Sequence, residues 1–171
     1  VDLAADAAER ARRPHLFERA LELMRPVCLD IHLEVDLADA LSRTEPQKAA
    51  AIADAAADRA HAAGVETGEA LARVVAANIR GWTHPDASLD ELDALARAAL
   101  PLLEQAGDHV GLAHVWYALG FTVANTRCQF EEHAHASEQA LRHARLAGRP
   151  RSDLFHLDGA LAFGPRPADE A

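Results

Sequence analysis

Apolar residues along this chain recur at intervals of three and four, which is the spacing of one face of an α-helix. The clearest runs lie at 28–43, 69–82, 89–103 and 110–125. The run between 46 and 63 differs, because its apolar face is almost entirely alanine: Ala49, Ala53, Ala56, Ala57 and Ala60. Alanine is the best helix former and lets helices approach closely. No stretch alternates in the manner of a β-strand, so the pattern predicts an all-α fold.

Three of the predicted helices end in the same way. Ala63-Gly64, Ala106-Gly107 and Ala147-Gly148 each close one alanine-rich stretch and lead into another, at spacings of 43 and 41 residues. This period is typical of a helix-pair repeat. We expect one domain, 1–171, of antiparallel pairs at about 8–43, 46–82, 88–125 and 129–163. Such pairs bury both faces only by stacking into an α-solenoid.

Helix boundaries can be predicted from local chemistry. Pro14 suits the first turn of a helix, where its missing N–H costs nothing. Thr44 with Gln47, and Ser88 with Glu91, have the spacing of a capping box and predict two helix starts. The last residues, 165–170, resemble the opening of one more helix, so we expect the chain to be a piece of a longer protein.

The charge balance excludes one class of partner. The chain of 171 residues has 17 basic and 27 acidic side chains, a net charge of −10. Nucleic-acid binding needs clustered Lys and Arg, which are absent here. A positively charged peptide or domain would be attracted instead. There is no apolar run of membrane-spanning length and no signal peptide, so we expect no membrane partner and a cytoplasmic location.

Trp116-x-x-Leu119-Gly120 resembles the start of a tetratricopeptide repeat, and Ala140-Leu141 resembles the Ala-Leu of its second helix with one residue inserted. The segments ALPLLEQAGDHVGLAHVWYALG and LDGALAFGPRPADEA are similar to long-repeat arrays in large actinobacterial transcriptional regulators and signal-transducing NTPases. The sequence departs from the standard repeat in its period, which is 41–43 rather than 34 residues. It also carries His133 where the family prefers Ala.

The resemblance implies a right-handed, tetratricopeptide-like solenoid that acts as a non-catalytic interaction or regulatory scaffold. In such arrays the first helix of each pair lines a concave groove. The corresponding positions here are His32, Asp39, Asn78, Trp82, His114, Tyr117, Phe121, Asn125, Phe155 and Asp158. The expected partner is a protein, a peptide or a neighbouring domain of the same polypeptide. Exposed faces of the terminal repeats would also allow a homodimer. The alternative for Trp82 and Tyr117 is packing against the neighbouring repeat.

Candidate catalytic and metal-binding chemistry is sparse. Glu132-x-x-His135 has the spacing of a di-iron ligand pair, but a second such pair is missing, so a solvated helix start is the simpler interpretation. Cys28 and Cys128 lack zinc spacing and are expected to pack as small apolar residues. We therefore expect no enzyme activity, no metal and no cofactor. Two rival functions remain: a small-molecule or peptide sensor, and a metal-dependent enzyme on a helical bundle.

Overall fold

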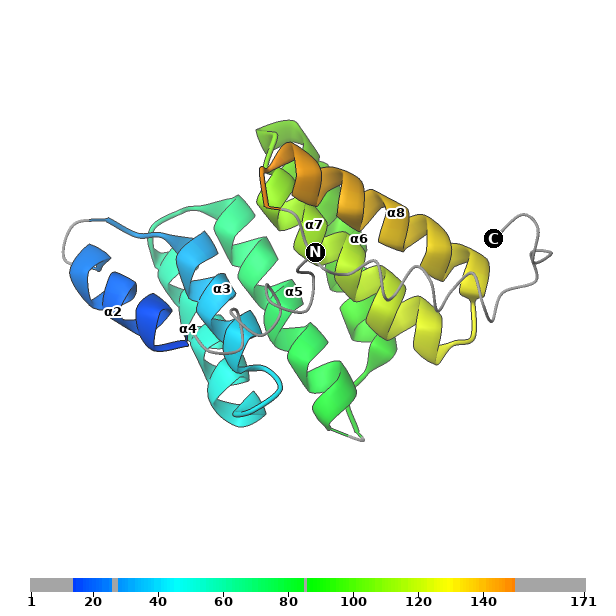
Figure 1. Cartoon of the computed structure of the whole chain (residues 1–171), viewed down its shortest axis with the longest axis horizontal. Coiled ribbons are helices and arrows are strands. Elements are labelled where there is room, and N and C mark those ends of the chain that lie inside the picture. The colour runs from blue at the N-terminus through cyan, green and yellow to red at the C-terminus, as the bar shows by residue number, and fades with distance from the viewer. Residues whose placement is uncertain (1–13, 26–27, 85, 150–171) are drawn as a thin grey trace, which may run out of the picture. The chain divides into compact units, whose positions relative to one another are not determined.

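The computed structural model describes residues 14–25, 28–84 and 86–149, and their regular structure consists of helices joined by short connections (Figure 1). Within these ranges no residue forms a β-strand. The predicted all-α class is therefore confirmed. The chain divides into two compact units, 1–87 and 88–171, which are described separately below. None of the helices in the described ranges is long and apolar enough to cross a bilayer.

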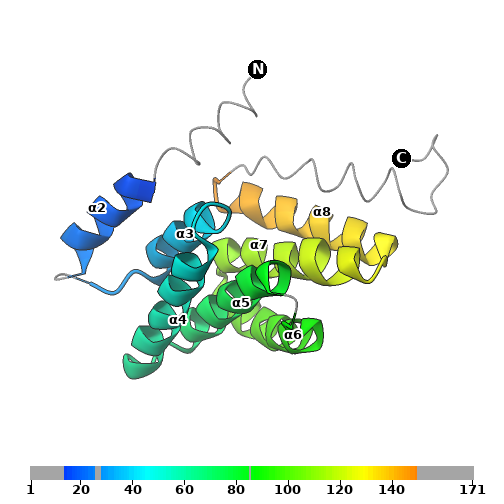
Figure 2. The ribbon, with the colours of Figure 1, turned by 90° about the horizontal axis from the view of Figure 1, so that it is seen from below.

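The first unit contains α2 (Pro14–Met24), α3 (Ile31–Leu41), α4 (Pro46–Ala62) and α5 (Glu66–Thr83). Helix α2 packs on α3, α3 on α4, and α4 on α5, so that chain neighbours are also neighbours in space (Figure 2). Helix α4 buries the alanine face that the sequence predicts: Ala49, Ala53, Ala56, Ala57 and Ala60. Alanine offers little area, so larger residues of α3 and α5, such as Val35 and Leu71, supply most of the apolar burial.

The second unit contains α6 (Leu89–Ala106), α7 (His109–Tyr117), η1 (Ala118–Ala124) and α8 (Phe130–Leu146). Helix α7 continues without a break into η1, which is π-helical, so one long helix changes its hydrogen-bond pattern in mid-course. Helix α8 packs along both parts of this helix, and α6 contacts both parts as well. The periodicity predicts the helix at 110–125 but gives no sign of the π-helical turn.

Four helix ends share one backbone motif. Gly64, Gly107 and Gly148 have φ of 69°, 66° and 66°, and the residue after each donates its N–H to a carbonyl five residues back. This is the Schellman motif, in which a left-handed residue satisfies the last carbonyls of the helix. The fourth case is Cys128, with φ of 57°, followed by a bond of 2.8 Å from Gln129 N to Ala124 O. A cysteine thus occupies the position that glycine fills at the other three ends.

The caps only partly match the prediction. Ser88 accepts a hydrogen bond of 3.1 Å from Glu91 N, so the predicted cap of α6 is confirmed. The predicted cap at Thr44 is wrong, because α4 begins after Glu45 and Thr44 Oγ1 instead donates to the carbonyl of Leu41. Helix α3 begins at Ile31 rather than at Cys28, because the carboxylate of Asp30 caps it.

Candidate functional site

The predicted groove residues of the second unit lie along the single helix formed by α7 and η1. Tyr117 and Phe121 stack on each other, with ring centroids 5.3 Å apart and an angle of 21° between the rings. Both rings remain partly exposed, and Asn125, one turn further on, is exposed. His114 is buried, with 9% of its surface accessible, so a partner would touch little of it. The structure therefore brings three of these four residues into one partly exposed row.

The groove residues of the first unit are less well exposed as a set. His32 and Asp39 lie two turns apart on α3, the first half-buried and the second exposed. Asn78 on α5 is buried at 9% exposure. The side chain of Trp82 and the residues Phe155 and Asp158 lie outside the part of the chain that the structure describes. Among the predicted site residues of the first unit whose side chains the structure describes, His32 and Asp39 are accessible.

The π-helical segment places a glycine against the facing helix. A Cβ atom at Gly120 would lie 3.0 Å from the Cβ of Ala136 and 3.4 Å from the carbonyl oxygen of His133. Any larger residue would push η1 away from α8. Gly120 therefore permits a close contact between η1 and α8. His133 itself is buried at 3% exposure, as expected for a residue that faces the partner helix.

Trp116 lies one turn before Gly120 and meets α8 through a different contact. Its ring packs edge-to-face against the imidazole of His135, with centroids 5.7 Å apart. Its indole Nε1 is buried and has no acceptor among the residues the structure describes. A buried N–H without an acceptor loses its hydration without compensation. This atom is therefore a place where an external acceptor would be favoured.

The helix start at 130–135 carries no assembled metal centre. Glu131, Glu132 and His135 are exposed, in agreement with a solvated helix start. Within the described ranges, His, Cys, Asp and Glu side chains form no group of three or more that could hold a metal ion. Cys28 and Cys128 are free thiols and are exposed, so the prediction that they pack as small apolar residues is wrong. Each lies in a connection between helices rather than on a buried helix face.

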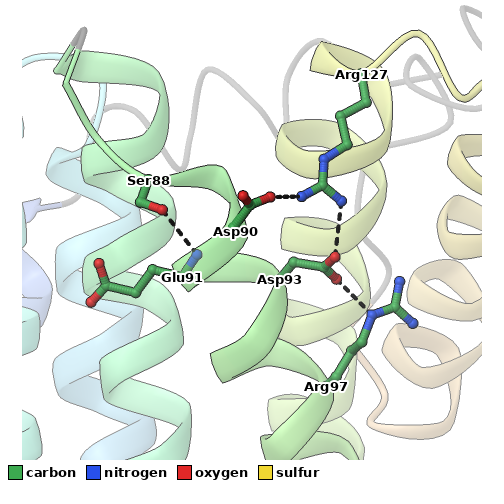
Figure 3. Close-up of polar contacts among 6 residues, drawn as sticks. All are labelled: Ser88, Asp90, Glu91, Asp93, Arg97 and Arg127. Carbon is green, nitrogen blue, oxygen red and sulfur yellow. Dashed lines mark hydrogen bonds and ion pairs between the residues drawn. The ribbon is translucent and has the colours of Figure 1, made fainter.

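An arginine near the end of the long helix ties it to the start of α6 (Figure 3). Arg127 donates to a carboxylate oxygen of Asp93 at 2.9 Å and also pairs with Asp90. Arg97 donates to the other oxygen of Asp93 at 2.7 Å. Burial raises the pKa of Asp93, but hydrogen bonds and charges from Arg127 and Arg97 outweigh it, so the pKa lies below its usual value. The network fixes the helix end that carries Asn125.

Two histidines that the sequence did not single out meet in the second unit. His109 at the start of α7 and His143 near the end of α8 approach with their Nδ1 atoms 3.1 Å apart and their ring centroids 5.2 Å apart. Burial lowers the pKa of His143, and the neighbouring His109 and Arg142 lower it further, against an opposing effect of Glu104. The two residues are 34 positions apart, so no local spacing could have indicated the pair.

The first unit contains a buried carboxylate that the sequence analysis also missed. Glu34 is 1% exposed and accepts hydrogen bonds from Arg59 of α4, at 3.1 Å from Nε, and from Arg25 at 3.4 Å. A buried carboxylate requires such partners. A signal was present in the sequence, because Glu34 lies on the apolar stripe of α3 beside Ile31 and Val35.

Comparisons with known proteins add no relative: no family model, curated protein or solved structure matches the chain.

Proposed function

We propose that the chain is a non-catalytic interaction segment, and that a peptide or protein binds along the α7–η1 helix at Tyr117, Phe121 and Asn125. The observation that carries this proposal is the stacked and partly exposed aromatic pair. Aromatic side chains supply large contact area at low entropic cost and are enriched among residues that dominate interface energies. An amide at Asn125 adds a donor and an acceptor for a peptide backbone.

The ordered surface around Tyr117 and Phe121 supports the same proposal. The two rings brace each other, and the helix end beyond them is held by the Arg127 network. A surface that is already ordered loses less entropy on binding than a flexible one. The net charge of −10 favours a partner that carries Lys or Arg beside its apolar residues. The ligand we expect is therefore a basic peptide with at least one apolar anchor.

Membership of a tetratricopeptide-like array is part of the proposal. It is supported by the recurrence of one helix-ending motif at Gly64, Gly107 and Gly148 and by the close approach that Gly120 allows. A repeat architecture presents rows of side chains from successive helices to a partner. In that setting the segment would serve a larger bacterial regulator or signalling NTPase as its interaction or regulatory part.

A selection from a library of displayed 12-residue peptides tests the proposal. Peptides selected on the wild-type chain are measured by calorimetry against Tyr117→Ala, Phe121→Ala and Asn125→Ala. We expect each aromatic variant to weaken binding about tenfold or more, which corresponds to roughly 1.4 kcal/mol. The matched controls are Leu23→Ala and Leu146→Ala, which remove exposed apolar side chains elsewhere. Equal losses in the controls, or no selected peptide at all, would count against this function.

A second candidate function is binding of a small molecule beside Trp116, because the buried indole N–H has no acceptor among the described residues. A carboxylate, phosphate or carbonyl oxygen of a ligand would supply one. A thermal-stability screen of metabolites with such groups tests this, since a ligand that binds only the folded state raises its stability. Trp116→Phe keeps most of the ring and removes the N–H, so stabilisation by a true ligand should be lost in this variant. Stabilisation that persists in it would argue against the site.

A further inference from the structure

We propose that His109 and His143 form a two-histidine site for a divalent transition-metal ion of the kind that prefers imidazole, such as Zn²⁺. The site lies within the second unit, between the start of α7 and the end of α8. It is separate from the Tyr117–Phe121 pair, and the proposal does not depend on peptide binding.

The distance between the two rings fits this role. Their Nδ1 atoms are 3.1 Å apart. Zinc–nitrogen bonds are about 2.0–2.1 Å long, so two ligands on one ion lie roughly 2.9 Å apart at a right angle and about 3.3 Å apart at the tetrahedral angle. The two nitrogens are thus at the separation of neighbouring ligands without any movement of the helices. Facing imidazoles further apart than about 4 Å would have needed such a movement.

The protonation states of the two imidazole rings also allow both to bind one metal ion. Without metal, one Nδ1–H donates to the other Nδ1, and only one of the two nitrogens carries the shared proton. Metal binding needs both Nδ1 lone pairs. The ring that donates must therefore move its proton to Nε2 through water, and no net proton is released from a neutral pair. The neutral imidazole is the form that binds metals.

Two charged side chains near the pair affect a bound cation, and positions on the ion remain for ligands other than the two histidines. The negative charge of Glu104 on α6 attracts a cation bound between the two rings, whereas the positive charge of Arg142 on α8 repels it. No third ligand of the usual kind stands close enough to complete a closed site among the described residues. Water or an external ligand would therefore fill the other positions, as at sites with an open coordination place. Imidazole ligands favour Zn²⁺, Cu²⁺ and Ni²⁺ over Mg²⁺ or Ca²⁺.

Calorimetric titration of Zn²⁺ into the full chain, prepared without a histidine tag, tests the proposal. The chain carries Cys28→Ser and Cys128→Gly, because exposed thiols bind zinc. We expect one ion per chain, with affinity about tenfold weaker or worse in His109→Ala and in His143→Ala. The matched control is His135→Ala, an exposed histidine on the same helix as His143, which should bind like the parent. Mg²⁺ should not bind at this place.

A second measurement covers the case in which an alanine variant fails to fold. Nitrogen-15 NMR of the imidazoles in the parent chain should show Nδ1 of both His109 and His143 shifting when Zn²⁺ is added, with both rings in the Nε2–H form. Zinc that shifts the nitrogens of other histidines and leaves these two unchanged would overturn the proposal. The same conclusion would follow from equal affinity in the parent chain and the two variants, or from the absence of binding.

Discussion

The two units of this chain keep polar groups inside their helical packing in different ways. The first unit buries a full charge, the carboxylate of Glu34, and satisfies it with Arg25 and Arg59 from outside its own helix. The second unit instead buries neutral or titratable groups, His114, Thr122, His133 and Ser137 among them, around a helix with a π-helical segment. Its charged side chains pair at the periphery, as Arg127 does with Asp90 and Asp93.

The two units therefore differ in the contacts that hold their helices in place. A buried ion pair fixes the geometry of the elements that contribute to it, because an unpaired buried charge is strongly unfavourable. The long helix of the second unit is held instead by the more exposed ion pairs of Arg127 with Asp90 and Asp93, and π-helical turns are frequent at functional sites. The features proposed for binding, the Tyr117–Phe121 pair and the π-helical segment, lie in the second unit. One variant for each feature can test this comparison, with Trp82 and Trp116 as separate fluorescent reporters for the two units.

The largest effect is expected from Arg59→Met in the first unit. This change leaves Glu34 buried with only the longer contact to Arg25. Removal of one partner from a buried pair costs about 3 kcal/mol or more. Urea unfolding followed in a Trp116→Phe background, where Trp82 reports, measures the loss. Arg80→Met is the control, because the exposed pair of Arg80 with Asp54 should contribute less than about 1 kcal/mol. Equal losses in the two variants would contradict the account of the first unit.

The next effect is expected from Gly120→Val in the second unit. The added methyl groups would meet Ala136 and the backbone of His133, where even a Cβ is tightly placed. Overpacking of this kind costs about 1–3 kcal/mol. Unfolding in a Trp82→Phe background, where Trp116 reports, should show the loss. Ala94→Val on the exposed face of α6 is the matched control and tests helix propensity alone, which is worth less than about 1 kcal/mol.

A smaller effect of opposite sign is expected from Cys128→Gly. Cys128 adopts φ of 57°, a conformation that costs an L-residue about 1 kcal/mol and glycine almost nothing. The variant should therefore gain about 1 kcal/mol of unfolding free energy. Gly107→Ala, the reverse change at a matched helix end, should lose a similar amount. Destabilisation by Cys128→Gly would mean that the thiol makes a contact that outweighs the backbone cost.

The smallest effect concerns pH. The pKa of Asp93 lies below its ordinary value of 3.8 because Arg127 and Arg97 outweigh the effect of burial. The folded state therefore resists protonation, so this stabilisation is complete above the ordinary pKa and disappears as pH falls through the lowered one. We expect a contribution below about 1 kcal/mol, given the exposure of the arginines. Stability measured from pH 5 to pH 2 should fall less steeply in Asp93→Asn than in the wild type. Parallel curves would exclude the interaction as a source of stability.

Local sequence patterns predicted much of the fold. The alanine face of α4, the cap at Ser88 and the glycine helix ends all follow from rules that act within a few residues. The π-helical turn and the Schellman ending at Cys128 did not follow, because each depends on packing against α8 or on the chain that comes next. The cap at Asp30 was missed, and the predicted cap at Thr44 is wrong because the Thr44 hydroxyl bonds back to the carbonyl of Leu41 in the preceding turn.

The candidate site was predictable only along one helix. His114, Tyr117, Phe121 and Asn125 share a face because their spacing follows the helical period, and this could be derived without a structure. The helical spacing does not tell which of these side chains are exposed to solvent. The predicted groove therefore includes His114 and Asn78, although both side chains are buried. The pairs His109–His143 and Glu34–Arg59 join residues 34 and 25 positions apart, and only the tertiary fold brings them together.

The most direct test of the central claim is the affinity of one selected basic peptide for the wild-type chain and for the double variant Tyr117→Ala/Phe121→Ala, measured at the same salt concentration. Circular dichroism of the variant confirms that it remains helical. The account predicts a loss greater than the roughly tenfold loss of either single variant; because the two rings contact each other, the two losses are not expected to add. An unchanged affinity in a folded double variant would contradict the claim that this aromatic pair forms the binding surface.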